Sequence, residues 1–180
     1  MKAVIITGSP HKKGTSALLA DEFIRGLQDS GHETYRFDAA FSNVKGCLGC
    51  NHCRKTGEPC VHHDDMEKLV PYLLEADAVI FVTPIYYFGM SSQLKTVIDR
   101  FYAPEKTLMG NKKAVLMASA GSPETIIAKN LTGLYQDVVG WMQWENAGQI
   151  LALGCYSREE IEKSEYPDQA YELGKRLFNR

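Results

Sequence analysis

The chain has 180 residues, with 20 lysines and arginines against 22 aspartates and glutamates, and a formal net charge of −2. Hydrophobic residues make up 44% and charged residues 23%, which is typical of a soluble globular protein and excludes a disordered chain. The near-neutral charge argues against a nucleic-acid partner. No apolar run approaches the ~18 residues of a membrane span, so no membrane partner is expected either. The length suits a single domain over residues 1–180.

The first residues and the cysteines bear on the cellular compartment. Residues 1–7 are too short and too rich in β-branched side chains for a secretion signal. We therefore expect a cytoplasmic protein, in which thiols stay reduced. Four of the five cysteines nevertheless crowd into residues 47–60, so this cluster is expected to serve a purpose other than disulfide bonding.

Short β-branched runs alternate along the chain with longer segments whose apolar residues recur every three or four positions. The runs predict strands at residues 1–7, 33–38, 78–82, 113–119 and 147–153. The periodic segments predict helices at residues 15–30, 65–75, 91–101, 124–144 and 165–178. The expected helix caps are Thr15 or Ser16, Asp64 or Asp65, and Ser91 or Ser92. Residues 43–63 are rich in glycine, proline and polar residues without periodicity, which predicts a cysteine-rich loop insertion after the second strand.

Strands that alternate with helices predict an α/β fold with a parallel sheet covered on both faces. Five strands fit the flavodoxin-like doubly wound order 2-1-3-4-5. Ligands of such sheets bind beyond the carboxyl ends of the strands, at the switch point between strands one and three. We therefore expect the functional loops to follow Thr7, Val82 and Ser119.

The loop after the first strand, residues 8–16, runs from a buried strand directly into a helix. Free N–H groups and the helix dipole favour an anion there. A P-loop is excluded, because five residues separate Gly8 from Gly14 and Thr15 stands where the lysine should be. The dinucleotide fingerprint fails because Pro10 replaces its second glycine. A cradle of backbone and hydroxyl groups remains, which favours a monophosphate such as that of FMN; the alternative is an ordinary capped turn. The hydroxyl donors are those of Ser9, Thr15 and Ser16.

The loops after the third and fourth strands suggest a site for a flat ring. Three consecutive aromatic residues, Tyr86 to Phe88, follow the third strand, and Pro84 stiffens their turn. They predict contact with a planar ring, or alternatively packing against a helix or a second subunit. The loop at 119–124 is small and polar, so its N–H groups could bond flavin oxygens, although an ordinary turn has the same composition.

These motifs resemble the NADPH-dependent FMN reductase family of flavodoxin-like proteins. The matching segments are Gly8-Ser9-Pro10, Gly14-Thr15-Ser16, Thr83-Pro84-Ile85-Tyr86, Ser92-Gln93-Leu94-Lys95 and Asp99-Arg100. The resemblance implies an FMN-dependent NAD(P)H oxidoreductase that passes electrons from a nicotinamide to a small acceptor such as flavin or quinone. It also implies a homodimer or homotetramer. Because the flavin carries the reaction, we expect no catalytic acid, base or nucleophile.

The same resemblance implies roles for individual residues. Phosphate contacts are expected from Ser9, Thr15 and Ser16 around Gly14, with help from Lys13 or His11. Residues expected to frame the ring are Pro84, Ile85, Tyr86, Tyr87 and Phe88. Residues expected at the far edge of the ring are Ala120, Gly121 and Ser122. One position departs from the family's pattern, because His11 stands where many members carry arginine.

The cysteine spacing, Cys47-x2-Cys50-x2-Cys53-x6-Cys60, resembles the compact motif of the iron–sulfur flavoproteins, which carry FMN and a 4Fe–4S cluster. The same spacing is compatible with reduced structural or redox thiols, or with a zinc site. One alternative function is therefore an iron–sulfur flavoprotein that relays electrons between protein partners. A second alternative does not depend on the cysteines: a phosphate-binding module without redox chemistry, in which Tyr86, Tyr87 and Phe88 serve packing alone.

Overall fold

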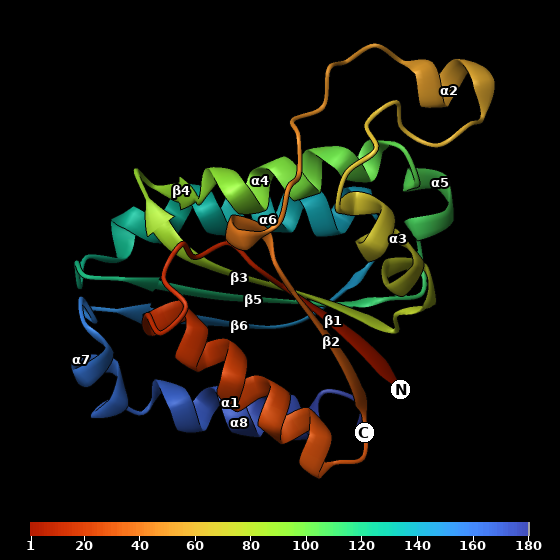
Figure 1. Ribbon diagram of the computed structural model, residues 1–180. Coiled ribbons are helices and arrows are strands. Elements are labelled where there is room, and N and C mark those ends of the chain that lie inside the picture. Colours follow the sequence, from red (N-terminus) through yellow and green to blue (C-terminus); the bar gives the residue numbers. More distant parts are fainter. Residues whose placement is uncertain (180) are drawn as a thin grey trace.

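The computed structural model describes residues 1–179 and contains a parallel sheet in the order β2-β1-β3-β5-β6 (Figure 1). The parallel strands are β1 Lys2–Thr7, β2 Glu33–Asp38, β3 Ala78–Tyr86, β5 Lys113–Ala120 and β6 Glu145–Leu153. A further strand, β4 (Gly89–Met90), pairs antiparallel with β3. The predicted α/β fold with a parallel sheet is confirmed. The expected sheet order 2-1-3-4-5 is numbered 2-1-3-5-6 in the structure, because the sequence did not predict β4; a two-residue strand is too short to produce a recognisable alternation.

Helices cover both faces of the sheet (Figure 1). On one face lie α1 Thr15–Asp29, α7 Arg158–Glu162 and α8 Tyr166–Arg176. On the other lie α3 Met66–Glu75, α4 Ser92–Asp99, α5 Glu105–Leu108 and α6 Lys129–Trp141. Short 3-10 turns occupy Ala39–Phe41, Arg100–Tyr102 and Thr125–Ala128. In the described part of the chain, no helix has the length and apolar character needed to cross a membrane.

Strand β1 shows how the sheet divides the core into two layers. Val4 and Ile6 pack in the layer that contains α3, α4 and α6. Ala3 and Ile5 pack in the layer that contains α1 and α8. Successive side chains of a strand point to opposite faces, so the apolar run from Ala3 to Ile6 is what a sheet covered on both sides requires.

The helix caps agree with the prediction at α4, differ from it at α1 and agree in part at α3. Ser91 caps α4 as expected, since its hydroxyl accepts a hydrogen bond from the Leu94 N–H. The residue before α1 is Gly14, and no side chain caps this helix. The prediction of a Thr15 or Ser16 cap is therefore wrong; both hydroxyls bond elsewhere, as described below. At α3 the residue before the helix is Asp65, as expected, but its side chain makes no cap; instead Asp64 Oδ1 accepts a hydrogen bond from the Met66 N–H, the first of the helix, at 3.1 Å.

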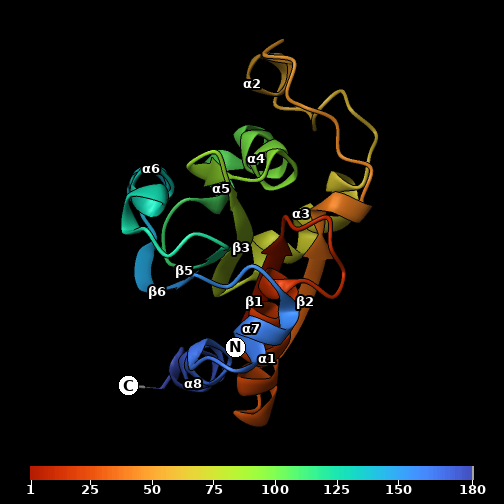
Figure 2. The ribbon, with the colours of Figure 1, turned by 90° about the vertical axis from the view of Figure 1, so that its left-hand side faces the viewer.

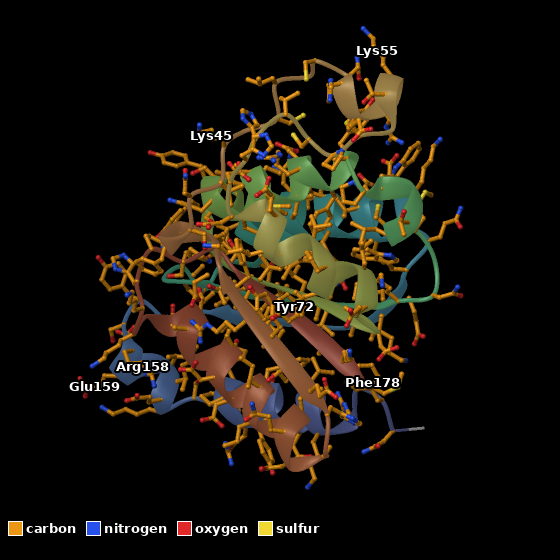
Figure 3. All side chains as sticks on the ribbon, turned by 45° about the vertical axis from the view of Figure 1, so that its right-hand side comes forward. Lys45, Lys55, Tyr72, Arg158, Glu159 and Phe178 are labelled. Atoms are coloured by element: carbon orange, nitrogen blue, oxygen red, sulfur yellow. The ribbon has the colours of Figure 1, made fainter. Side chains whose placement is uncertain are left out.

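The cysteine-rich segment, residues 43–63, projects from the body of the molecule (Figure 2). It contains a short helix that the sequence did not predict, α2 His52–Thr56, near its tip. Figure 3 shows Lys45 near the base of the segment and Lys55 on α2. An ion pair between Arg54 and Glu105 joins α2 to α5. The Tyr102 hydroxyl donates to Asn51 Oδ1 at 2.9 Å, which provides a second tie to the body.

Candidate functional site

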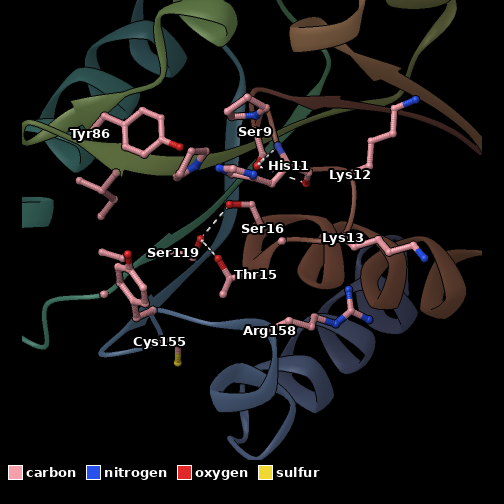
Figure 4. Close-up of a pocket in the computed structure, with 17 residues that line it drawn as sticks. Ser9, His11, Lys12, Lys13, Thr15, Ser16, Tyr86, Ser119, Cys155 and Arg158 are labelled. Carbon is pink, nitrogen blue, oxygen red and sulfur yellow. Dashed lines mark hydrogen bonds between the residues drawn. The ribbon is translucent and has the colours of Figure 1, made fainter.

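A cavity of about 840 Å³ opens at the carboxyl ends of β1, β3, β5 and β6 (Figure 4). The last residues of β3 and β5, the loops that follow the strands and the first residues of α1 and α7 supply its lining: Ser9, Pro10, His11, Lys12, Lys13, Gly14, Thr15, Ser16, Pro84, Ile85, Tyr86, Ser119, Ala120, Gly121, Cys155, Tyr156 and Arg158. The position agrees with the rule for doubly wound sheets. The volume lies within the ~300–1,000 Å³ of small-molecule sites.

The loop after β1 forms one end of the cavity around the start of α1. Because no side chain caps α1, the N–H groups of its first turn are available to a ligand. The Gly14 N–H bonds the His11 carbonyl at 3.1 Å, which closes the loop into a tight turn. The His11 N–H donates to Ser9 Oγ at 3.2 Å, and Ser9 is buried. This end of the cavity therefore offers backbone donors in a fixed arrangement.

Three hydroxyls form a buried cluster that joins two of the loops (Figure 4). Ser119 Oγ lies 2.8 Å from Thr15 Oγ1 and 2.7 Å from Ser16 Oγ. Ser16 and Ser119 are almost fully buried. The cluster locks the start of α1 against the end of β5, and this is why neither hydroxyl caps α1. Sequence reasoning did not include Ser119 among the site residues, although its position at the carboxyl end of a predicted strand indicated that it could lie at the site.

The carboxyl ends of β3 and β5 form the other walls, because β3 extends to Tyr86, beyond the predicted strand end at Val82. Pro84, Ile85 and Tyr86 line the cavity from β3, and Ala120 and Gly121 line it from β5. Three predicted residues lie outside this lining: Tyr87, Phe88 and Ser122.

Tyr87 and Phe88 form the two-residue turn between β3 and β4. Their φ angles are 45° and 67°, and Tyr87 is 100% exposed. Positive φ at both positions is the requirement of a type I′ hairpin turn, and it is unfavourable for bulky side chains. The chain therefore turns at two aromatic residues and not at the glycine that follows them, Gly89.

The loop after β6 also reaches the cavity, and sequence reasoning missed it. Cys155 and Tyr156 belong to this loop, and Arg158 is the first residue of α7, which follows it. Cys155 is buried, and burial raises the pKa of its thiol. A Cβ at Gly121 would lie 2.8 Å from Tyr156 Cδ2, so Gly121 allows this aromatic ring to pack on the loop after β5. The position of this loop in the fold could have identified it, because the carboxyl end of β6 lies at the same edge of the sheet as those of β1, β3 and β5.

The cavity is cationic although the chain carries a net charge of −2. Its lining, within the described residues, includes Lys12, Lys13 and Arg158 but neither aspartate nor glutamate. Lys12 Nζ lies 4.7 Å from the centre of the Phe41 ring, a cation–π contact that holds this side chain at the rim. The charge favours an anionic ligand.

The four clustered cysteines lie away from this cavity lining, on the projecting segment. Cys47 and Cys50 are exposed, whereas Cys53 and Cys60 are partly buried. Within residues 1–179, no three histidine, cysteine or acidic side chains come together as a metal site would require. The structure therefore does not gather the predicted iron–sulfur ligands into one site.

Sequence comparison places the chain among flavin-dependent proteins. A model of the family described as NADPH-dependent FMN reductase matches residues 1–142. A protein of Archaeoglobus fulgidus named iron–sulfur flavoprotein is 38% identical over 130 residues, which are 70% of this chain and 59% of that protein. The FMN-dependent NADH:quinone oxidoreductase of Bordetella petrii is 32% identical over 118 residues, 59% of this chain and 55% of that protein. The chain spans about half to three fifths of the first curated relatives it matches.

Solved structures show the same fold. The NAD(P)H:quinone oxidoreductase of Methanothermobacter marburgensis superposes with a TM-score of 0.79 at 20% identity, covering 100% of this chain and 97% of that one. An azoreductase of Bacillus anthracis gives 0.78 at 17% identity, with 98% and 99% coverage. These likenesses establish the flavodoxin-like α/β architecture, and the family match covers most of the sequence. The chain therefore belongs to the NADPH-dependent FMN reductase family.

Proposed function

We propose that this chain is an FMN-dependent NAD(P)H oxidoreductase that passes electrons from a nicotinamide to a small acceptor such as flavin or quinone. The observation that carries the proposal is one cavity with two chemically distinct ends. The uncapped start of α1 and the cationic rim suit a phosphate, while Pro84, Ile85 and Tyr86 suit a flat ring. FMN combines these two parts in one molecule.

The residues take different roles in this proposal. Ser9, Thr15 and the N–H groups after Gly14 hold the phosphate, with Lys13 and His11 at the rim. Ser16 acts through its buried bond to Ser119, which fixes the start of α1. Ala120 and Gly121 approach the far edge of the ring. Bound FMN supplies the ability to accept a hydride and pass electrons on, and the protein supplies position and electrostatics.

The exposed aromatic turn supports a subunit contact next to the cavity. Tyr87 is fully exposed and Phe88 is 46% exposed, while the neighbouring Tyr86 lines the cavity. Exposed aromatic residues of this kind are typical of protein interfaces. We accordingly propose a single FMN-binding domain over residues 1–180 that forms a cytoplasmic homodimer or homotetramer.

The test is the visible spectrum and activity of the purified protein. We expect flavin absorbance with one FMN per chain, and oxidation of NADPH or NADH when a quinone or free flavin is added. A protein that neither retains nor takes up FMN would contradict the proposal and favour the phosphate-binding module without redox chemistry.

Gly14→Val tests the phosphate end. A Cβ at Gly14 would lie 3.0 Å from His11 Cβ and 3.3 Å from the His11 carbonyl oxygen, so valine must open the turn. We expect FMN affinity to fall about tenfold or more, because the backbone donors lose their alignment. Gly46→Val is the matched control, since a Cβ at Gly46 meets no atom within 4 Å. Fluorescence titration measures the FMN affinity of the two variants. Equal affinities in Gly14→Val and Gly46→Val would contradict the assignment of the FMN phosphate to this loop.

A second candidate function is an iron–sulfur flavoprotein that relays electrons between protein partners. The spacing of Cys47, Cys50, Cys53 and Cys60 favours it, as do the names of several relatives. Because the four side chains are not gathered in the structure, we assign no step to a cluster. If the protein is nevertheless an iron–sulfur flavoprotein, anaerobic purification should yield about four irons and four sulfides per FMN. Cys50→Ala should lose this iron while Cys155→Ala retains it; flavin colour without iron in the unaltered protein would exclude this function.

A further inference from the structure

Arg158 reaches the cavity from a different element than the loop after β1. It is the first residue of α7 and lines the same cavity as Lys13 and Thr15 (Figure 4). Its side chain is 36% exposed, so it is neither part of the core nor free in solvent. Within the described lining, no carboxylate competes for its charge from inside the cavity.

An ion pair on α7 sets the direction of the Arg158 guanidinium. Its Nε donates to Glu162 Oε1 at 2.6 Å, across one helical turn. Within residues 1–179, neither Nη atom has a hydrogen-bond partner, so the outer edge of the guanidinium remains available. Arginine presents two parallel N–H groups on that edge, which match two oxygens of a phosphate.

We propose that Arg158 is a second phosphate-binding group of this cavity, positioned by Glu162 and acting together with the loop after β1. The inference rests on the proposed function, because it assumes that a phosphorylated ligand occupies the cavity. It adds a residue that the sequence motifs do not contain.

Two phosphates could occupy this position. One is the phosphate of FMN, which is absent from riboflavin. The other is the extra phosphate of NADPH, which is absent from NADH. Both carry close to two negative charges at neutral pH, so each would gain from a charge-assisted pair of hydrogen bonds. Comparing each ligand with its counterpart that lacks the phosphate distinguishes the two sources.

The experiment uses Arg158→Gln, with Lys163→Gln as its matched control. Lys163 also pairs with a glutamate one turn away, Glu159, but its side chain is 73% exposed and does not line the cavity. If the FMN phosphate is the target, Arg158→Gln should raise the Kd of FMN about tenfold, or about 1.4 kcal/mol, and leave that of riboflavin unchanged. If NADPH is the target, the KM of NADPH rises about tenfold while that of NADH stays constant.

Further variants separate charge from geometry. Arg158→Lys should restore only part of the affinity, because lysine keeps the charge but lacks the paired donors. Glu162→Gln should cause a smaller loss than Arg158→Gln, since it removes only the orienting partner. The Arg158→Gln effect should also shrink at high salt.

The outcomes separate this inference from the proposed function. Suppose that the unaltered protein binds FMN and oxidises NADPH. If Arg158→Gln then raises neither the Kd of FMN more than that of riboflavin nor the KM of NADPH more than that of NADH, the inference is wrong and the proposed function stands. Equal weakening of FMN and riboflavin also contradicts it, because that result indicates a structural role. An unaltered protein that binds no flavin contradicts both.

Discussion

Replacing Arg100 with methionine is expected to lower the free energy of unfolding by about 3–5 kcal/mol, because it leaves a buried carboxylate without its counter-ion. Arg100 Nη1 lies 2.6 Å from Asp64 Oδ2, and the two side chains are 2% and 0% exposed. In the described part of the chain, no other ion pair is buried to this degree. Methionine has a similar length, so the loss comes from the charge and the hydrogen bonds rather than from a large cavity.

The same variant should loosen the cysteine-rich segment. Arg100 Nη1 also donates to the Lys45 carbonyl at 2.8 Å, and the Lys45 N–H donates to Asp64 Oδ2 at 3.0 Å. The ion pair therefore fastens both ends of residues 46–63 to the body. We expect limited proteolysis to cut Arg100→Met faster within this segment than the unaltered protein.

The pH dependence of the loss identifies its cause. Burial alone would raise the pKa of Asp64, but the bonds from Arg100, Lys45 and Met66 outweigh it and hold this pKa below its ordinary value. The resulting stability is fully present above the unfolded pKa of about 3.9, and it is lost as pH falls through the lower folded pKa. In Arg100→Met the carboxyl takes up a proton more readily, so the difference between the two proteins should shrink toward pH 4.

Urea unfolding at pH 7 and near pH 4 measures the effect. Lys163→Met is the control, since it breaks an exposed pair with Glu159 and should cost less than about 1 kcal/mol. A loss below about 1 kcal/mol in Arg100→Met at pH 7 would show that the buried pair contributes no more than an exposed one.

The features that the sequence predicted are those carried by local patterns. The apolar run before Thr7 predicts strand β1, and the periodic segment after Ser16 predicts helix α1. The alternation of such strands and helices along the chain predicts a parallel sheet. That arrangement places the loops after Thr7, Val82 and Ser119 at one edge, where the cavity lies. The family resemblance added the identity of the ligand, which periodicity alone does not provide.

The features that escaped prediction depend on contacts between distant segments. The bonds from Ser119 to Thr15 and Ser16 join residues more than 100 positions apart. The pairing of Asp64 with Arg100 likewise becomes visible only after folding, although both residues belong to segments that the sequence singled out. Arg158 follows the last strand, whose loop carries no recognisable motif. Side-chain partners of this kind follow from tertiary packing rather than from propensity.

Gly8→Ala is expected to lower the free energy of unfolding by about 3 kcal/mol and to weaken FMN binding. Gly8 begins the loop after β1 and is packed directly against the start of α4. A Cβ at Gly8 would collide with Ser91 Oγ and lie 2.7 Å from Leu94 Cβ. Ser91 has little freedom to move away, because its hydroxyl donates to the Gly8 carbonyl at 2.7 Å and also caps α4.

A double-mutant cycle with Ser91→Ala tests whether this contact is the cause. Ser91→Ala alone should cost about 1 kcal/mol through the lost cap, but it removes the nearest atom in the way of a Cβ at Gly8. Gly8→Ala should therefore cost less in the Ser91→Ala background than in the unaltered protein, a departure from additivity expected of residues in contact. Gly133→Ala, within α6, is the control; its Cβ meets no atom within 4 Å, so it should stabilise slightly. Strict additivity between the two substitutions would mean that Gly8 is required for a reason other than its contact with α4.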